Sequence, residues 1–445
     1  MSTPQLVLCV ILIGSLIIQA LRPQYRLLIV TVAAGITCLV STLFSTASTP
    51  QLLSEVPWDV LVILIGLGLL SELLVTSRLF GLLSLWSTQA SRAHPGRIVL
   101  YFSVGMYVVS GLVNNITALL LVLPVLLILI KLLGVGQRYV SWLLGVLLVA
   151  CNLGGAATPI GDFPAILLLG RGHMSFSRYL HYAAPTTLFA LLILLCTVMM
   201  WIRPTRGLSA DGLSAQLSVA VMRKLYRNVQ LDWKLAIPSL CLLGAMLIAW
   251  IVVPQQSGIT PDLICWIGVG LALLWRAHLG EQLLRTRVDF EAVLFLLGLF
   301  VMVGAVRKTG LFSLLALKLS SLPLPPRGQL LLFLLVSGIT TGLFSAGPSM
   351  AALLEVAEVL AKQFPPHAVY VGLALSVCAG SSFLLTAATS GPLLQTMTER
   401  AGLRDENGQS LRFGFFEFLP VGLLSFAIIE AVAIGFALIA SAQSP

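Results

Sequence analysis

Charged side chains are scarce in this chain. Asp, Glu, Lys and Arg make up 10% of its 445 residues, whereas soluble domains carry about 25%. Hydrophobic residues make up 58%, and the mean hydropathy is +1.01. A soluble fold has too little interior to hide that much apolar surface. The composition therefore excludes a soluble enzyme, a disordered chain and a fibrous protein, and it predicts a helical protein that spans the lipid bilayer several times.

The chain also lacks the sequence marks of several other functions. None of the seven cysteines lies in a C-x-x-C pair or at metal-ligand spacing from a histidine. The basic residues are scattered and form no run with aromatic partners, so we expect no binding of nucleic acid. There is no P-loop. Residues 159–162 (Pro-Ile-Gly-Asp) approach an intramembrane aspartyl protease motif but lack its first glycine and a partner aspartate. We therefore expect neither enzyme activity nor an organic cofactor.

Long apolar runs dominate what is present. A bilayer crossing takes about 20 residues, and stretches of about that length or longer lie near residues 5–21, 27–46, 57–76, 140–170, 181–202, 235–253, 261–276, 290–306, 367–395 and 414–440. Two more stretches, 98–133 and 328–362, are interrupted at residues 113–117 and 344–349. We predict two re-entrant hairpins there, because polar tips satisfy backbone groups at membrane depth. The alternative for each is two full crossings with a tight turn. The total is about eleven spans plus two hairpins.

Lys and Arg residues indicate the topology, because they concentrate in cytoplasmic loops. With both hairpins in place the N-terminus lies outside, and 19 of the 26 basic residues lie inside, Arg22 and Arg26 among them. The seven outside are Arg171, Arg178, Arg307, Lys308, Lys318, Arg327 and Lys362. We expect a multi-pass protein of a bacterial inner membrane or an equivalent internal membrane.

The two halves of the chain repeat each other. In each half a span that opens with an aspartate, Asp59 or Asp289, is followed by a hairpin and then by a span interrupted by glycine, at 140–170 or 367–395. The halves start on opposite sides, which makes an inverted repeat of the kind found in secondary transporters. We predict N-terminal spans at 1–50, a first repeat at 51–202, a cytoplasmic linker at 203–234, linking spans at 235–287 and a second repeat at 288–440.

Four segments carry a resemblance to a known group. They are Asn-Asn-Ile-Thr at 114–117, the glycine-rich run at 152–162 that ends in Pro-Ile-Gly-Asp, residues 288–305, and Cys-Ala-Gly-Ser-Ser at 378–382. Over most of residues 50–440 the chain resembles the ion transporter superfamily. That group includes arsenite/antimonite permeases, D-type sodium/proton antiporters, dicarboxylate and citrate carriers, and the melanosomal P protein. The resemblance implies a scaffold and a moving transport unit, usually in a homodimer.

The resemblance also implies that the hairpin tips and the broken spans form the ion and substrate sites. The matching residues in the two halves are Asn114, Asn115, Thr117, Asn152, Gly154, Thr158 and Asp162, and then Ser345, Gly347, Ser349, Gly380, Ser381, Ser382 and Thr386. The carboxamides of Asn114, Asn115 and Asn152 supply uncharged oxygen ligands and are the candidate ligands for Na⁺.

Acidic residues within membrane segments are candidates for proton coupling. They are Asp162, Glu355 and Glu430. Each has an alternative role. Asp162 could cap the second half of its broken helix. Glu355 could face a water-filled vestibule, and Glu430 could form an interhelical hydrogen bond.

The acids and the Gly-Asp pair favour sodium/proton antiport, with Na⁺ or H⁺ as the coupling ion. An arsenite or other inorganic anion permease is the second choice. A sodium-coupled dicarboxylate or citrate carrier is the third, because neither hairpin tip has the Ser-Asn-Thr typical of dicarboxylate carriers. A channel or a non-transporting membrane sensor is the alternative from another class.

Overall fold

The computed structural model confirms the all-α polytopic class. It describes residues 3–22, 25–170, 173–205, 220–221, 224, 231–253, 257–405 and 408–442. Nine of the described helices are long and apolar enough to cross a bilayer, and three further apolar helices are shorter. Within the described residues the only β-type pairing is one isolated bridge, between Arg404 and Ser410. Most of the expected linker at 203–234 lies outside the described residues.

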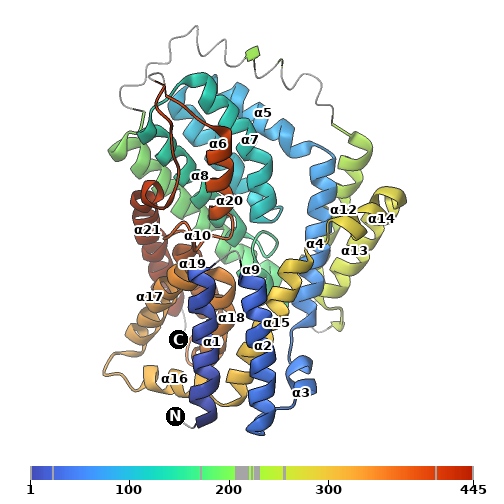
Figure 1. The fold of residues 1–445 in the computed structure, drawn as a ribbon, viewed down its shortest axis with the longest axis vertical. Coiled ribbons are helices and arrows are strands. Elements are labelled where there is room, and N and C mark those ends of the chain that lie inside the picture. The colour runs from blue at the N-terminus through green and yellow to red at the C-terminus, as the bar shows by residue number, and fades with distance from the viewer. Residues whose placement is uncertain are drawn as a thin grey trace.

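The chain begins with a helix pair outside the repeats. Helices α1 (Thr3–Leu21) and α2 (Arg26–Leu43) run side by side in opposite directions, and the short α3 (Thr49–Ser54) follows (Figure 1). Helix α2 packs along α15 (Phe290–Lys308), where Gly298 leaves room for the Val30 side chain. The pair is therefore attached to the first helix of the second half.

Each half then runs through the same series of seven helices. The first series is α4 (Trp58–Thr76), α5 (Leu79–Ser91), α6 (Pro95–Ser110), α7 (Asn115–Leu133), α8 (Gln137–Ala157), α9 (Phe163–Gly170) and α10 (Phe176–Thr197), which a π-helical turn (Val198–Ile202) extends. The helices between the halves are α12 (Trp233–Val252), α13 (Pro261–Trp275) and α14 (Ala277–Thr286). The second series is α15, α16 (Leu311–Ser320), α17 (Pro326–Phe344), α18 (Ala346–Leu360), α19 (Pro366–Ser381), α20 (Gly391–Ala401) and α21 (Phe415–Ala442).

Matching local geometry supports the repeat. Both α5 and α16 begin after a residue with positive φ, Arg78 at 64° and Gly310 at 76°. Both α6 and α17 have proline in their first turn, where its missing N–H costs nothing. In Figure 1, α4 runs upward from α3 to α5, whereas α15 runs downward to α16. The two series are therefore inverted relative to each other.

The two expected hairpins are each a pair of helices joined by a short break. The break after α6 covers residues 111–114, and the break after α17 is the single residue Ser345, with φ 78°. The arms differ in length, since α7 and α17 have 19 residues while α6 has 16 and α18 has 15. Whether the hairpins re-enter or cross the membrane stays a prediction.

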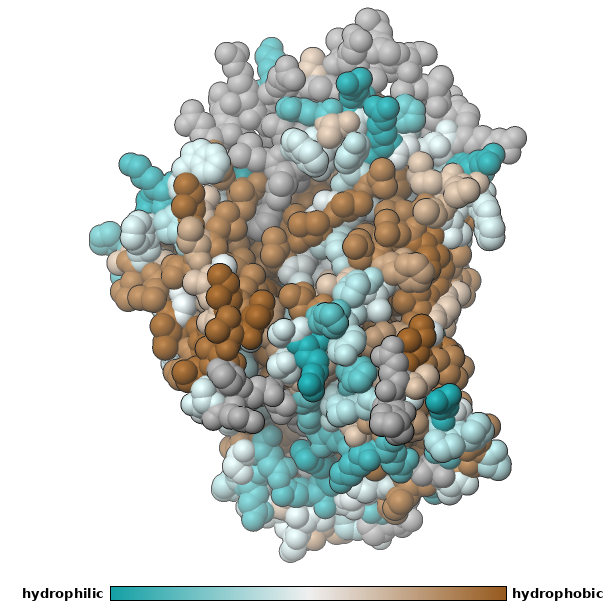
Figure 2. All heavy atoms as spheres, turned by 180° about the vertical axis from the view of Figure 1, so that it is seen from behind, coloured by the Kyte–Doolittle hydropathy of each residue, from teal (hydrophilic) through white to brown (hydrophobic). Residues whose placement is uncertain are grey.

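Apolar side chains cover much of the outer surface. Trp201, Phe416 and Leu274 are 83%, 80% and 71% exposed, and Figure 2 shows brown side chains gathered over the middle of one face, with hydrophilic ones at its lower end. Exposure of this kind suits lipid contact, because lipid tails do not penalise apolar surface. The protein is thus a multi-pass integral membrane protein.

Glycine allows the helices of each half to touch closely. A Cβ on Gly154 of α8 would overlap the Tyr107 carbonyl of α6, and a Cβ on Gly380 of α19 would overlap the Gly338 carbonyl of α17. The two contacts are equivalent: α8 meets α6 within the first half, and α19 meets α17 at the same place in the second half. Close approach of this kind between small residues is a usual means of helix association in membranes.

We predict that Gly154→Ala and Gly380→Ala each lower the free energy of unfolding by about 1–3 kcal/mol, because the added methyl must displace backbone. The matched control is Gly244→Ala in α12, where a Cβ meets nothing within 4 Å. Thermal unfolding of the detergent-purified variants measures the effect. Equal melting temperatures for all three variants would contradict the packing described here.

Candidate functional site

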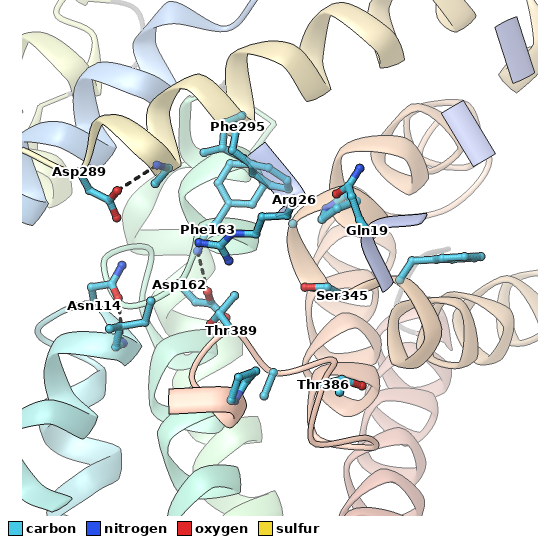
Figure 3. Close-up of a pocket in the computed structure, with 18 of the residues that line it drawn as sticks. Gln19, Arg26, Asn114, Asp162, Phe163, Asp289, Phe295, Ser345, Thr386 and Thr389 are labelled. Carbon is cyan, nitrogen blue, oxygen red and sulfur yellow. Dashed lines mark hydrogen bonds between the residues drawn. The ribbon is translucent and has the colours of Figure 1, made fainter. Parts of the chain in front are cut away.

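A cavity of about 190 Å³ lies where the two halves meet (Figure 3). All four helix interruptions contribute to its wall: Asn114 at the first hairpin tip, Asp162 between α8 and α9, Ser345 at the second tip, and Thr386 between α19 and α20. Helices α1, α2 and α15 complete the wall. Chain breaks far apart in sequence therefore converge on one cavity.

Asp162 lies at the end of the break that follows α8. One carboxylate oxygen, Oδ1, accepts a hydrogen bond of 2.9 Å from the Phe163 amide at the start of α9. The carboxylate also interacts with the side chain of Asn115. Among the described residues it forms no ion pair. Asp162 thus both bonds the first amide of α9 and places a carboxyl group at the cavity.

The first hairpin tip is fastened to the break after α8 by polar side chains. Asn114 Oδ1 accepts 2.9 Å from the Ile116 amide and caps α7. Asn115 is 2% exposed, accepts a hydrogen bond from Ser110 and rests on Gly155, where a Cβ would collide with it. Thr158 Oγ1 donates to the Gly111 carbonyl at 2.6 Å. Only Asn114 of these three sequence-predicted residues lines the cavity.

Asn152 joins the two halves behind the cavity. Its Nδ2 donates to the Ser381 carbonyl at 3.2 Å and lies 3.1 Å from Ser382 Oγ. All three residues are buried. The Ser381 hydroxyl itself donates to the Cys378 carbonyl at 2.9 Å. Residues that the sequence analysis assigned to separate half-sites therefore contact each other directly.

The remaining predicted residues divide by position. Ser345, Gly347 and Thr386 line the cavity, as do Asn114 and Asp162. Ser349 is buried in the first turn of α18. Gly154 and Gly380 lie where neighbouring helices touch. Thr117 lines an adjoining cavity beside Glu72 and Arg287, which shares Asn114 and Asp289 with the first. Of Asn114, Asn115 and Asn152, only Asn114 lines the cavity, and a Na⁺ site on the three residues stays a prediction.

The two glutamates proposed for proton coupling do not line the cavity. Glu355 on α18 is buried and lies 3.0 Å from Arg307 Nε. Arg307 also lies 3.5 Å from Glu358, which is 3.2 Å from His173. Glu355 therefore belongs to a charged cluster that joins α15 to α18.

Glu430 on α21 also has protein partners. It accepts a hydrogen bond of 3.1 Å from the Ser376 hydroxyl of α19, and its side chain lies against Gly338 of α17. Glu430 is 3% exposed. In this conformation Glu430 makes an interhelical hydrogen bond, which is the alternative role given for it in the sequence analysis.

The sequence analysis missed two cavity residues from the N-terminal helix pair. Arg26 begins α2, and Gln19 lies near the end of α1; both side chains line the cavity (Figure 3). Arg26 Nε lies 3.4 Å from Glu291, and the guanidinium carbon lies 5.7 Å from the centroid of the Phe295 ring. The only sequence signal was one arginine and one glutamine between two apolar spans, and Arg26 was interpreted there as a loop charge.

Inverted repeats with interrupted helices that meet at a central cavity define a secondary transporter. Residues 10–376 match the family model described as citrate transporter. The chain belongs to the citrate transporter family.

The chain is also similar to several named proteins and, in fold, to one solved structure. An uncharacterized transporter of Mycobacterium tuberculosis is 28% identical over 78% of this chain and 80% of the relative. The magnetosome protein MamN of Magnetospirillum gryphiswaldense is 25% identical over 82% of both. Sodium/proton antiporter 2 of Arabidopsis thaliana is 24% identical over 65% of this chain and 67% of that protein. The YdaH transporter of Alcanivorax borkumensis has a similar fold, with TM-score 0.56 and 14% identity over 99% of this chain and 98% of that one.

We predict that Arg307→Gln lowers the free energy of unfolding by about 2 kcal/mol, because it removes the cation that pairs with the buried Glu355 carboxylate. A double variant with Glu355→Gln should recover part of the loss, as a double-mutant cycle detects. Arg285→Gln is the control, since its pair with Glu281 is exposed and worth about 0.5 kcal/mol or less. Chemical or thermal unfolding in detergent gives the numbers. Additive effects of the two substitutions would refute the coupling.

Proposed function

We propose that the protein is a cation-coupled secondary transporter of a small carboxylate, and that Asp162 binds the coupling cation, Na⁺ or H⁺. One observation carries the proposal: Asp162 presents a carboxylate to the central cavity with no ion-pair partner among the described residues. Charged residues at membrane depth are costly, and they are usually tied to function. The description of the family supports a carboxylate as cargo.

The charges of the cavity favour coupling between a cation and an anion. Asp162 and Asp289 are acidic and Arg26 is basic, and all three line the wall. A cation at Asp162 removes one negative charge from a confined space of low dielectric constant, so an anion enters at lower electrostatic cost. By linkage the anion then strengthens binding of the cation by the same factor.

The interrupted helices supply further ligands for both ions. The end of α8 directs backbone carbonyls toward the break, and the start of α9 directs N–H groups toward it. Carbonyls suit a cation and N–H groups suit an anion. The scaffold, the moving unit and the homodimer that the resemblance implies are part of this proposal.

A second candidate, sodium/proton antiport, is favoured by a specific feature of the same residue. A single carboxylate holds either Na⁺ or a proton at one time. If the site opens to each side of the membrane in turn, competition between the two ions for it is sufficient to exchange one for the other. Among the described residues, Asp162 is the only Asp or Glu that both lies in a break of a helix and lines the cavity. Under this reading the cavity carries no organic cargo.

We predict that Asp162→Asn lowers cation-stimulated citrate counterflow in proteoliposomes at least tenfold, because the amide does not carry the charge that attracts the cation. Vesicles loaded with unlabelled citrate take up labelled citrate, with and without gradients of Na⁺ and pH. Asp262→Asn makes the same chemical change in the first turn of α13, away from the cavity, and should transport like the wild type.

The antiport candidate is tested in the same vesicles without carboxylate. An internal pH dye reports alkalinisation of an acid interior when Na⁺ or Li⁺ is added outside. An Asp162-dependent response with no citrate counterflow would establish antiport in place of carboxylate transport. Neither activity, from protein shown to be folded by size-exclusion chromatography, would refute both candidates.

A further inference from the structure

We propose that Arg26, Gln19 and the amino end of α18 form an anion-binding subsite in the cavity that holds one oxyanion group, a carboxylate or an inorganic oxyanion. The role of this subsite in transport rests on the proposed function, but its binding chemistry does not. The subsite uses the N-terminal helix pair, which lies outside both repeats. It therefore adds a component that the repeat symmetry alone does not supply.

The Arg26 side chain is held in place by its neighbours, and some of its N–H groups remain available to a ligand. Its Nε faces Glu291 and its guanidinium lies beside the Phe295 ring. Within the described part of the chain, its two terminal nitrogens make no hydrogen bond. The side chain is 43% exposed and lines the cavity. A planar arginine fork with spare N–H groups matches an oxyanion with two acceptor oxygens.

Gln19 supplies a second donor, its side-chain Nε2. The residue is 9% exposed, and its Nε2 makes no hydrogen bond to the described residues. An unsatisfied buried polar group is unfavourable. Gln19 lines the same cavity as Arg26, and Figure 3 shows both side chains beside it. An acceptor ligand in the cavity would satisfy the amide.

The amino end of α18 completes a set of donors. Ser345, Gly347 and Pro348 line the cavity, and the helix runs 15 residues from Ala346. Its first turn contains no acidic residue, and the Ser349 hydroxyl in that turn is buried without a partner among the described residues. Free N–H groups and the helix dipole favour an anion at such an end.

The donors come from separate elements of the fold, which all contact α15. Arg26 and Gln19 belong to the helix pair that packs on α15, whereas α18 is an arm of the second hairpin. A bound oxyanion would therefore bridge the two. Asp162 lies on the wall of the same cavity, so the cation and the anion have separate residues to bind them.

Calorimetric titration of the purified full-length protein in nanodiscs tests the subsite. Citrate and sulfate are the probes, at constant ionic strength and with Na⁺ present. We expect Arg26→Gln to weaken binding of the oxyanion at least tenfold, because it removes the cation and the fork together. Arg26→Lys keeps the charge without the fork and should be intermediate. Gln19→Leu should weaken binding about three- to tenfold.

Arg22→Gln is the matched control, because it removes the same charge from an exposed residue just before α2 that does not line the cavity. Sulfate that competes with citrate in an Arg26-dependent manner identifies a general oxyanion site. Binding of citrate alone identifies a carboxylate site. Binding that is unchanged in Arg26→Gln, or no binding by folded wild-type protein, overturns the inference.

The same titration separates this inference from the proposed function. Asp162→Asn should still bind the oxyanion but lose the dependence on Na⁺ or pH. If wild-type binding depends on Arg26 and ignores the cation, the subsite stands and cation coupling at Asp162 is wrong. If binding responds to the cation but not to Arg26, coupling stands and the subsite is wrong.

Discussion

The structure depends on one constraint: polar backbone groups released by a helix break at membrane depth must find partners inside the protein. Lipid offers no hydrogen bonds, and each unsatisfied group is expensive. Four breaks occur in this fold, and they are placed against one another. Thr158 bonds the Gly111 carbonyl at the end of α6, and Asn152 bonds the Ser381 carbonyl at the end of α19. The cavity lies where these breaks meet.

This constraint separates two kinds of polar residue that look alike in the sequence. Asn115 and Asn152 are largely occupied with holding the breaks together, and they lie behind the cavity wall. Asp162, Arg26 and Gln19 line the wall and retain charge or hydrogen-bonding capacity beyond their structural contacts. The substrate contacts of a transporter must come from the second kind, since groups that already have partners gain little from a ligand.

The breaks could be predicted from the sequence because their signals are local. Glycine, proline and asparagine within apolar runs mark positions where a helix ends, and the two halves of the chain repeat the pattern. Arg26 and Gln19 could not be assigned to the site, because their position depends on how α1 and α2 pack against α15, at a separation of more than 250 residues. Thr117 was assigned by its place in a motif, yet it lines the adjoining cavity beside Glu72. A motif fixes where a turn occurs, whereas the direction of each side chain depends on the helix that follows.

The N-terminal helix pair gives the cavity an asymmetry that the repeats alone would not have. Inverted repeats place similar breaks on both sides of the site, but the breaks differ in charge: the break after α8 contains Asp162, while the corresponding break after α19, residues 382–390, contains no acidic residue. Arg26 comes from outside the repeats and adds a positive charge to the same space. Under the proposed function, the acid on the first broken helix binds the cation and the basic side chain held beside Phe295 binds the anion, so the two bound ions attract each other across the cavity. Under the proposed function each ion makes the other easier to bind by the same factor, which favours the carrier that holds both ions over the carrier that holds one.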